Sequence, residues 1–282
     1  MDIAVRRRFY AEEIQAISNL RTPALVEALA TTPRERFLGP GPWTIRSESD
    51  FQAAPRTTPS ADPSHLYHNV AVAIDPARQL FNGAPGLLAM TIDHLGLHPG
   101  DRALHIGAGT GYYTALIGAC VGPGGAAVAI EVDEGLAARA RVNLEATAWV
   151  DVRHGDGSAP LDGSFDAILV NAGVSHPLDA WLDALAEGGR IIVPLTVPMT
   201  PTIGKGLMVL LTKRPDPATL DARVIAFVAI YSALGVRDEI AGAALAAAMR
   251  TNPFPQLKDA RRDPHEQTPA CWLHAGSICL TI

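Results

Sequence analysis

The stretch ALHIGAGTGYYTALIGACVGPGGAAVAIEVD, Ala103–Asp133, decides the fold. Three alternating glycines, Gly107, Gly109 and Gly111, follow a short apolar run and precede an apolar segment with helical spacing. A second apolar run ends at the acidic residue Glu131. A strand, a glycine turn, a helix and a second strand in this order predict part of a parallel α/β sheet.

The same alternation continues along the chain and predicts an α/β fold, a doubly wound parallel sheet covered by helices on both faces. Strands are predicted at 102–106, 126–132, 150–156, 165–173, 189–195, 206–213 and 222–232. Helices are predicted between residues 5 and 30 and at 85–97, 112–122, 134–147, 178–185 and 237–250. Two short strands are expected around Ala275 and Gly276.

Three segments are expected from these patterns. Residues 1–75 hold N-terminal helices and a connector, 76–214 the ligand-binding core, and 215–282 the remaining strands, a helix and a C-terminal tail. The Pro-, Ser-, Thr- and Ala-rich part of the connector, residues 47–64, is predicted to be irregular and mobile. The tail could close the site or build a homodimer, and the sequence leaves both open.

Composition excludes several classes of protein. The 282 residues are 48% hydrophobic and 18% charged, enough for a large buried core, and the net charge of −6 argues against nucleic acid as a partner. Neither a signal peptide nor a membrane span is expected, which favours a cytoplasmic protein without membrane contact. Cys120, Cys271 and Cys279 lack CxxC spacing and are predicted to be reduced thiols.

The glycine spacing discriminates between cofactors. Glycines allow a sharp turn and close approach of a ligand to the backbone, and Glu131 can accept hydrogen bonds from ribose hydroxyls. A dinucleotide site requires G-x-G-x-x-G, but Tyr112 occupies the place of the third glycine. This disfavours an NAD-dependent oxidoreductase. The G-x-G-x-G form resembles the first motif of class I methyltransferases that use S-adenosyl-L-methionine and yield S-adenosyl-L-homocysteine.

Further candidates for cofactor binding follow the third and fourth predicted strands. Asp156 is placed to bind the adenine amino group, and Gly157 lets the ring lie against the backbone, although a simple turn would also use these residues. Asn171 ends the fourth strand, where local backbone bonds are the alternative. The predicted cofactor set is completed by Ala108, Thr110, Val132 and Gly83.

Together these segments resemble protein-L-isoaspartate O-methyltransferases. The resemblance rests on HIGAGTGYYTALIGACVG, AIEVDEGLAARARVNL, VRHGDGSAPL, FDAILVNAGVSHP and LDALAEGGRIIVPL, and on a PR-x-x-F signature at Pro33. It implies a Rossmann-like methyltransferase fold with a mostly parallel seven-stranded sheet, an N-terminal helical cap and a C-terminal extension. It also implies methyl transfer to the α-carboxylate of isoaspartyl residues in peptides or proteins.

The acceptor side departs from that family. Its T-I-S-x-P segment corresponds here to LFNGAP, and Asn82 and Gly83 replace the isoleucine and the hydroxyl-bearing residue. Two alternatives stay open: a small-molecule O- or N-methyltransferase, and a cofactor-binding protein without catalysis. A hydroxyl or amine acceptor would need a base, for which His176 is the candidate, with helix capping as its other role. His65 and His68 lack further ligands at a recognisable spacing, so no metal site is predicted.

Overall fold

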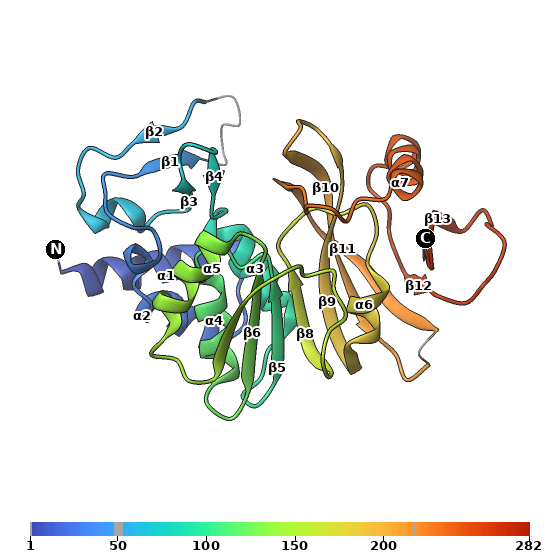
Figure 1. Cartoon of the computed structure of the whole chain (residues 1–282), viewed down its shortest axis with the longest axis horizontal. Coiled ribbons are helices and arrows are strands. Elements are labelled where there is room, and N and C mark those ends of the chain that lie inside the picture. The colour runs from blue at the N-terminus through green and yellow to red at the C-terminus, as the bar shows by residue number, and fades with distance from the viewer. Residues whose placement is uncertain (1, 48–52, 217) are drawn as a thin grey trace. The chain divides into compact units, whose positions relative to one another are not determined.

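The computed structural model describes residues 2–47, 53–216 and 218–282, and the chain divides into two compact units. Unit 1 comprises Met1–Asp101 and Ala108–Gly155, and unit 2 comprises Arg102–Gly107 and Asp156–Ile282. Figure 1 labels the helices and strands of both units.

Unit 1 begins with two helices, α1 (Ile3–Ser18) and α2 (Pro23–Thr31), and a 3-10 turn, η1 (Arg34–Phe37). The side chain of Asp2 caps α1 by accepting a hydrogen bond from the Ala4 N–H, and Pro23 is the first residue of α2, as predicted. The helices expected between residues 5 and 30 are therefore confirmed.

Most described residues of the connector, residues 47–64, lie outside helices and strands, as expected, but the two-residue strand β2 interrupts it. It contributes to a four-stranded sheet of order β2-β1-β3-β4, with a 3-10 turn, η2, before β3. A buried cluster that includes Trp43, Val72 and Leu136 stabilises this sheet, because it removes apolar side chains from water. Residues 48–52 of the connector lie outside the described residues. The elements are β1 (Thr44–Ser47), β2 (Arg56–Thr57), η2 (Pro63–Leu66), β3 (Val70–Asp75) and β4 (Leu80–Phe81).

The second half of unit 1 follows the predicted alternation. Strands β6 and β7 pair in parallel, from Ala127 opposite Val150 to Glu131 opposite His154. Gly96 and Gly122 end two of the helices with positive φ, which glycine adopts without steric cost. The elements are α3 (Pro85–Leu95), α4 (Tyr112–Val121), β6 (Ala126–Glu131), α5 (Glu134–Leu144) and β7 (Val150–His154).

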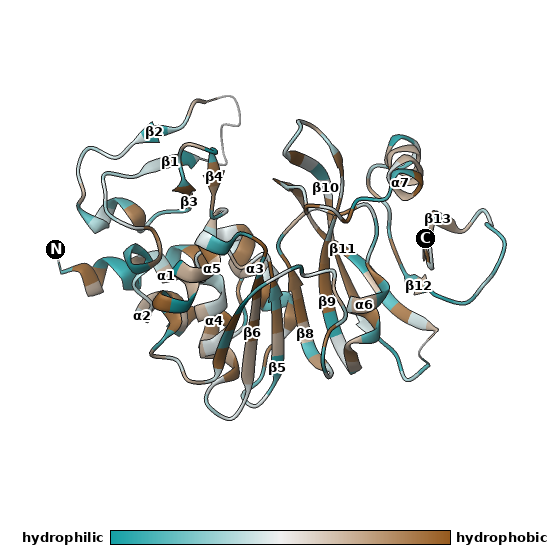
Figure 2. Ribbon diagram, in the orientation of Figure 1, coloured by the Kyte–Doolittle hydropathy of each residue, from teal (hydrophilic) through white to brown (hydrophobic). Residues whose placement is uncertain are grey.

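Unit 2 carries a mixed sheet with the strand order β13-β14-β12-β11-β10-β9-β8-β5. Strands β5, β8 and β9 pair in parallel, whereas β9 to β14 pair antiparallel. The core strands are β5 (Arg102–Ile106), β8 (Phe165–Val170), β9 (Leu185–Pro198), β10 (Ile203–Lys213) and β11 (Thr219–Tyr231), with helix α6 (Asp179–Asp183) between β8 and β9. Figure 2 shows hydrophobic residues along β8 and β9, in keeping with their buried interior positions.

The α/β class is confirmed, but the sheet has more strands and more antiparallel pairing than the seven mostly parallel strands expected. The reason is the short connections from β9 to β10 and from β10 to β11, which leave no room for the crossover that parallel pairing requires. The C-terminal extension adds helix α7 (Glu239–Thr251), β12 (Asp259–Arg261), β13 (Cys271–Ala275) and β14 (Ile278–Thr281), drawn in orange to red in Figure 1. Among the described residues, no helix has the length and apolarity to span a bilayer.

Candidate cofactor and methyl-acceptor site

The glycine loop that follows β5 has a left-handed backbone at each of its three glycines. The φ angles are +79° at Gly107, +57° at Gly109 and +92° at Gly111, a region that side chains with a Cβ rarely adopt. Gly111 is also the N-cap of α4. The turn itself therefore requires glycine at these positions, whether or not a ligand binds.

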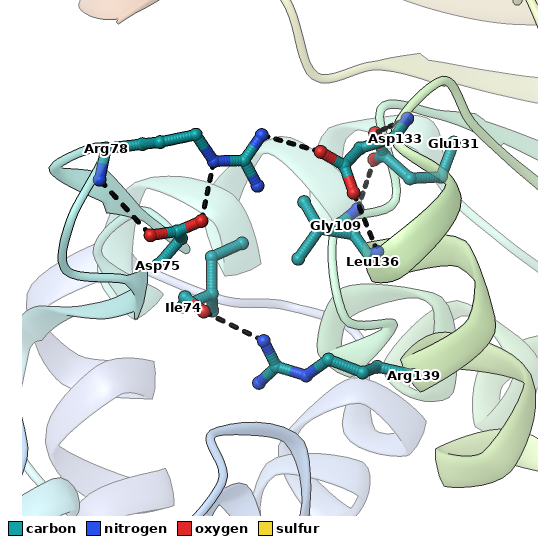
Figure 3. A network of polar contacts seen from close by, with 8 residues as sticks. All are labelled: Ile74, Asp75, Arg78, Gly109, Glu131, Asp133, Leu136 and Arg139. Atoms are coloured by element: carbon teal, nitrogen blue, oxygen red, sulfur yellow. Dashed lines mark hydrogen bonds and ion pairs between the residues drawn. The ribbon is translucent and has the colours of Figure 1, made fainter.

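The carboxylate of Glu131 holds this loop. Its Oε2 accepts a hydrogen bond of 2.7 Å from the Gly109 N–H, and its Oε1 accepts one of 3.0 Å from the Asp133 N–H (Figure 3). Glu131 is only 7% exposed. A carboxylate has about four acceptor positions, so these two bonds leave capacity for ligand hydroxyls.

An ion-pair chain joins Asp133, whose N–H donates to Glu131, to the small sheet. Figure 3 shows Arg78 between Asp75 and Asp133, with 2.6 Å from its Nε to Asp75 Oδ2 and from its Nη1 to Asp133 Oδ2. Asp133 also caps α5 by accepting from the Leu136 N–H, and this bond, aided by Arg78, lowers the pKa of Asp133. Sequence reasoning missed Arg78, because its two partners come from segments far apart in the chain.

Most N–H groups of the loop are already used inside the protein. The Ala108 N–H donates to the Ile130 carbonyl at 3.3 Å, and the Gly111 N–H donates to the Ala108 carbonyl at 3.0 Å. With the Gly109 N–H bound to Glu131, three N–H groups of the loop are unavailable to a ligand.

The remaining loop residues of the predicted set differ in exposure. Thr110 is buried, and its carbonyl accepts a hydrogen bond of 2.9 Å from Asn143 Nδ2, so its cofactor role stays a prediction. Val132 is 47% exposed directly after Glu131. An exposed apolar side chain at this position can pack against a flat apolar ring.

Asn82 and Gly83 lie after β4. Asn82 Oδ1 accepts a hydrogen bond of 2.9 Å from the Val72 N–H, and the Asn82 N–H donates to the Val72 carbonyl. Its buried Nδ2 has no hydrogen-bond partner among the described residues, so it is an available donor. Gly83 has φ +78°, and its carbonyl accepts from the Tyr113 hydroxyl at 3.1 Å.

In unit 2, Gly107 and Asn171 lie together. The Asn171 N–H donates to the Ile106 carbonyl at 2.8 Å, and Asn171 Nδ2 donates to the Gly107 carbonyl at 3.4 Å. A Cβ on Gly107 would approach the Asn171 carbonyl oxygen to 3.2 Å. Asn171 thus makes the local backbone bonds considered as its alternative role, and its ligand role stays a prediction.

Asp156 and Gly157 form a tight turn beside β5. Asp156 Oδ1 accepts from the N–H and the hydroxyl of Ser158, which is the turn geometry typical of aspartate. A Cβ on Gly157 would collide with the side chain of Ile106, and its carbonyl accepts a hydrogen bond of 2.7 Å from buried Trp181 Nε1. Close packing alone therefore requires glycine at this position.

His176 is half-buried in the loop after β8. Its Nδ1 lies 3.0 Å from the Ser175 hydroxyl, which also accepts a hydrogen bond from the Asp238 N–H at 3.1 Å. Sequence reasoning missed Arg237, whose guanidinium contacts the Gly173 carbonyl and Thr196 and fastens the same loop. His176 is thus held in one orientation by a buried serine.

The structure groups the predicted residues by unit. Unit 1 holds Ala108, Gly109, Thr110, Gly111, Glu131, Val132, Asn82 and Gly83, and unit 2 holds Gly107, Asp156, Gly157, Asn171 and His176. The His65–His68 pair is not part of any group of three or more metal-ligating residues in the described ranges. The ligand roles of these residues stay predictions.

Comparisons with known proteins identify the family. The family model for protein-L-isoaspartate(D-aspartate) O-methyltransferase matches residues 48–229. A protein-L-isoaspartate O-methyltransferase of Aeropyrum pernix is 34% identical over 235 residues, 81% of this chain and 80% of the relative. One of Methylorubrum populi is 30% identical over 241 residues, 83% of this chain and 99% of the relative.

Solved structures agree with this result. A protein-L-isoaspartate O-methyltransferase structure is similar with a TM-score of 0.63 and 25% identity, covering 80% of this chain and 66% of that one. A Plasmodium falciparum structure assigned to the same enzyme, in complex with S-adenosyl-L-homocysteine, gives a TM-score of 0.60 at 17% identity, covering 80% and 97% of the two chains. The latter supports the Rossmann-like fold alone.

Proposed function

Since the chain belongs to the protein-L-isoaspartate O-methyltransferase family, whose members are S-adenosyl-L-methionine-dependent methyltransferases, we propose that it methylates the α-carboxylate of isoaspartyl residues in peptides or proteins. The observation that carries the proposal is the buried Glu131 carboxylate, which holds the Gly109 loop and keeps acceptor capacity. We place the activity in the cytoplasm, where the three unpaired cysteines would stay reduced.

The cofactor is assigned to residues whose geometry fits it. Glu131 binds the ribose hydroxyls, and exposed Val132 packs against the adenine ring. The sequence pattern alone predicts Asp156 and Gly157 as further adenine contacts and the Gly107–Gly111 loop as the place of the methionine part.

The acceptor carboxylate is assigned to Asn82. The family's hydroxyl donor is replaced here by Gly83, but the neighbouring Asn82 offers a buried Nδ2 without a partner in the described part of the chain. Its Oδ1 is fixed by the Val72 N–H, so the Nδ2 hydrogens have a defined direction. A preorganised donor of this kind orients a carboxylate for attack.

When bound, S-adenosyl-L-methionine would supply an electrophilic methyl group: a carboxylate oxygen of the acceptor would bond to the methyl carbon as the sulfur–carbon bond breaks, which would leave S-adenosyl-L-homocysteine. The isoaspartyl carboxylate is already ionised at neutral pH and needs no general base. The protein's residues therefore bind, orient and exclude water, and His176 is not required for proton transfer to complete the reaction.

The test is methyl transfer to an isoaspartyl peptide, with the matched normal aspartyl peptide as control. We expect S-adenosyl-L-homocysteine and a methyl ester with the isoaspartyl peptide only, and retained activity in His176→Ala. No transfer to the peptide, with transfer to hydroxyl or amine compounds that His176→Ala abolishes, would favour the small-molecule alternative. Calorimetric binding of the cofactor without turnover on any acceptor would instead show a cofactor-binding protein without catalysis.

A further inference from the structure

Four metal-ligating side chains meet in the C-terminal tail, outside the residues matched by the family model. Their ligand atoms all lie within 4.8 Å of one another. Three of the residues are half-buried, and Cys279 is fully buried. The four residues are His265, Cys271, His274 and Cys279. Among the described residues no other group of three or more metal-ligating side chains is found.

The hairpin of β13 and β14 brings three of them together. His274 and Cys279 are direct cross-strand partners, so their side chains share one face. Cys271 lies three residues before His274 and would point to the opposite face of a regular strand. The register shift between Cys271 and Leu273 inserts one residue and returns Cys271 to the face of His274.

The fourth side chain, His265, comes from the loop between β12 and β13. Its Nδ1 lies 2.7 Å from the Asp263 carbonyl oxygen, so this nitrogen carries the proton and donates. Its Nε2 is then the unprotonated nitrogen and lies 3.8 Å from Cys271 Sγ. Histidines that bind metals are held by a backbone or carboxylate oxygen in this way.

Two polar features of the cluster also fit a metal. His274 Nδ1 is buried and has no hydrogen-bond partner in the described ranges, an arrangement that costs free energy unless something binds it. The Thr268 N–H donates to Cys271 Sγ at 3.3 Å, and such donation stabilises a thiolate. All three cysteines of the chain are free, so no disulfide occupies the site.

We propose that His265, Cys271, His274 and Cys279 bind one zinc ion. Two thiolates and two imidazoles are a donor set typical of tetrahedral structural zinc. Zinc bonds of about 2.0 to 2.3 Å place neighbouring ligand atoms about 3.3 to 3.8 Å apart, which the cluster reaches by small side-chain movements. Binding releases the two thiol protons, and the ion then balances both thiolate charges.

Four protein ligands close the site, so its role is structural rather than catalytic. The ion would fasten the loop of residues 262–270, which has no helix or strand, to the β13–β14 hairpin. Strand β14 pairs with β12, which in turn pairs with β11. Zinc would therefore join the tail to the edge of the unit 2 sheet, independently of the proposed methyl transfer.

The test is the metal content of the full chain, purified without a histidine tag or chelator. We expect about one zinc per chain by elemental mass spectrometry. Replacement by cobalt should give the visible bands of tetrahedral cobalt and thiolate charge-transfer bands in the near ultraviolet. A chain without zinc whose cobalt spectrum lacks thiolate bands would overturn the proposal, as would a Cys271–Cys279 disulfide detected by mass.

Variants separate specific binding from adventitious zinc. Cys271→Ser and His265→Ala should each lower zinc affinity by more than about 100-fold, since loss of an outer partner alone costs up to that factor. Cys120→Ala is the matched control, because it removes a thiol outside the cluster and should keep the full zinc content. Full zinc content in both cluster variants would contradict the proposal. If a cluster variant fails to fold, cobalt titration of the metal-free wild type decides.

Discussion

The carboxylate of Glu131 accepts a hydrogen bond of 2.7 Å from the backbone N–H of Gly109, across 22 residues of sequence. The bond joins the end of β6 to the glycine loop that leads to α4. One acid therefore fixes the loop conformation and offers its remaining lone pairs to a ligand. We therefore expect the conformation of the loop and cofactor binding to be coupled at this pair.

Glu131→Ala should weaken cofactor binding. A hydrogen bond to a charged acceptor contributes about 1.5 to 3 kcal/mol, so we expect a rise of roughly 10- to 100-fold in the Kd of S-adenosyl-L-homocysteine by calorimetry. Glu134→Ala is the control, because Glu134 is exposed in the first turn of α5 and should bind normally. Unchanged affinity in Glu131→Ala would show that the ribose assignment is wrong.

Substitutions at two loop glycines should have different effects. A Cβ on Gly109 would be 3.4 Å from its nearest neighbour, Ile74 Cδ1, whereas a Cβ on Gly111 would be 2.8 Å from Leu144 Cδ1. Either valine strains the left-handed backbone, but only the one at Gly111 also collides with a neighbour. Gly109→Val should therefore abolish cofactor binding with a smaller fall in melting temperature than Gly111→Val. Thermal unfolding and calorimetry on both variants test this. Normal turnover in Gly109→Val would show that the cofactor does not approach the backbone closely at Gly109.

Asn82→Asp should reduce activity without loss of fold. The substitution keeps an oxygen for the Val72 N–H but replaces the buried Nδ2 donor with an acceptor that repels a carboxylate. We expect kcat/KM for the isoaspartyl peptide to fall by roughly 10- to 100-fold. Asn69→Asp, which keeps the bond to the Gly86 N–H, is the matched control. Equal activity in the two variants would remove Asn82 from the acceptor site.

Arg34→Met should destabilise the protein. Arg34 is fully buried, and its guanidinium donates to the carbonyls of Leu66, His68 and Val70 at 2.5 to 3.2 Å. Loss of these bonds leaves buried carbonyls unpaired, so the free energy of unfolding should fall by about 3 kcal/mol. Exposed Arg36 in the same 3-10 turn provides the control, Arg36→Met. Equal free energies of unfolding for Arg34→Met and Arg36→Met, measured by chemical denaturation, would contradict the role of Arg34.

Stability should fall in acid partly because of His105. Burial in β5 lowers the pKa of His105 from 6.5 to about 4, so between these values the unfolded chain binds more protons than the folded one. The contribution of neutral His105 to the free energy of unfolding is complete above pH 6.5. It decreases by roughly 3 kcal/mol as the pH falls toward 4. Between pH 6.5 and 4, the free energy of unfolding should decrease less in His105→Gln than in exposed His98→Gln, as measured by denaturation at several pH values. Parallel curves would exclude His105 as the cause.

Local patterns of sequence determined much of the fold. Helical periodicity and the prolines predicted α1 to α5, and apolar runs predicted β5 to β11 close to their observed bounds. The small sheet around Val72 was missed because two of its strands have only two residues, too short for a periodic signal. The alternating glycines predicted the tight turn after β5, since backbone conformation at a tight turn is a local property.

Tertiary structure decided what depends on distant partners. Arg78 joins Asp75 to Asp133, and Arg34 receives its carbonyl partners from residues more than 30 positions away. The cluster of His265, Cys271, His274 and Cys279 shows the same limit, since no consecutive spacing marks it as a metal site. A strand bulge and a cross-strand pair bring Cys271, His274 and Cys279 to one face. Local propensity is encoded in neighbouring residues, whereas the direction of a side chain toward a distant partner is fixed only when the chain has folded.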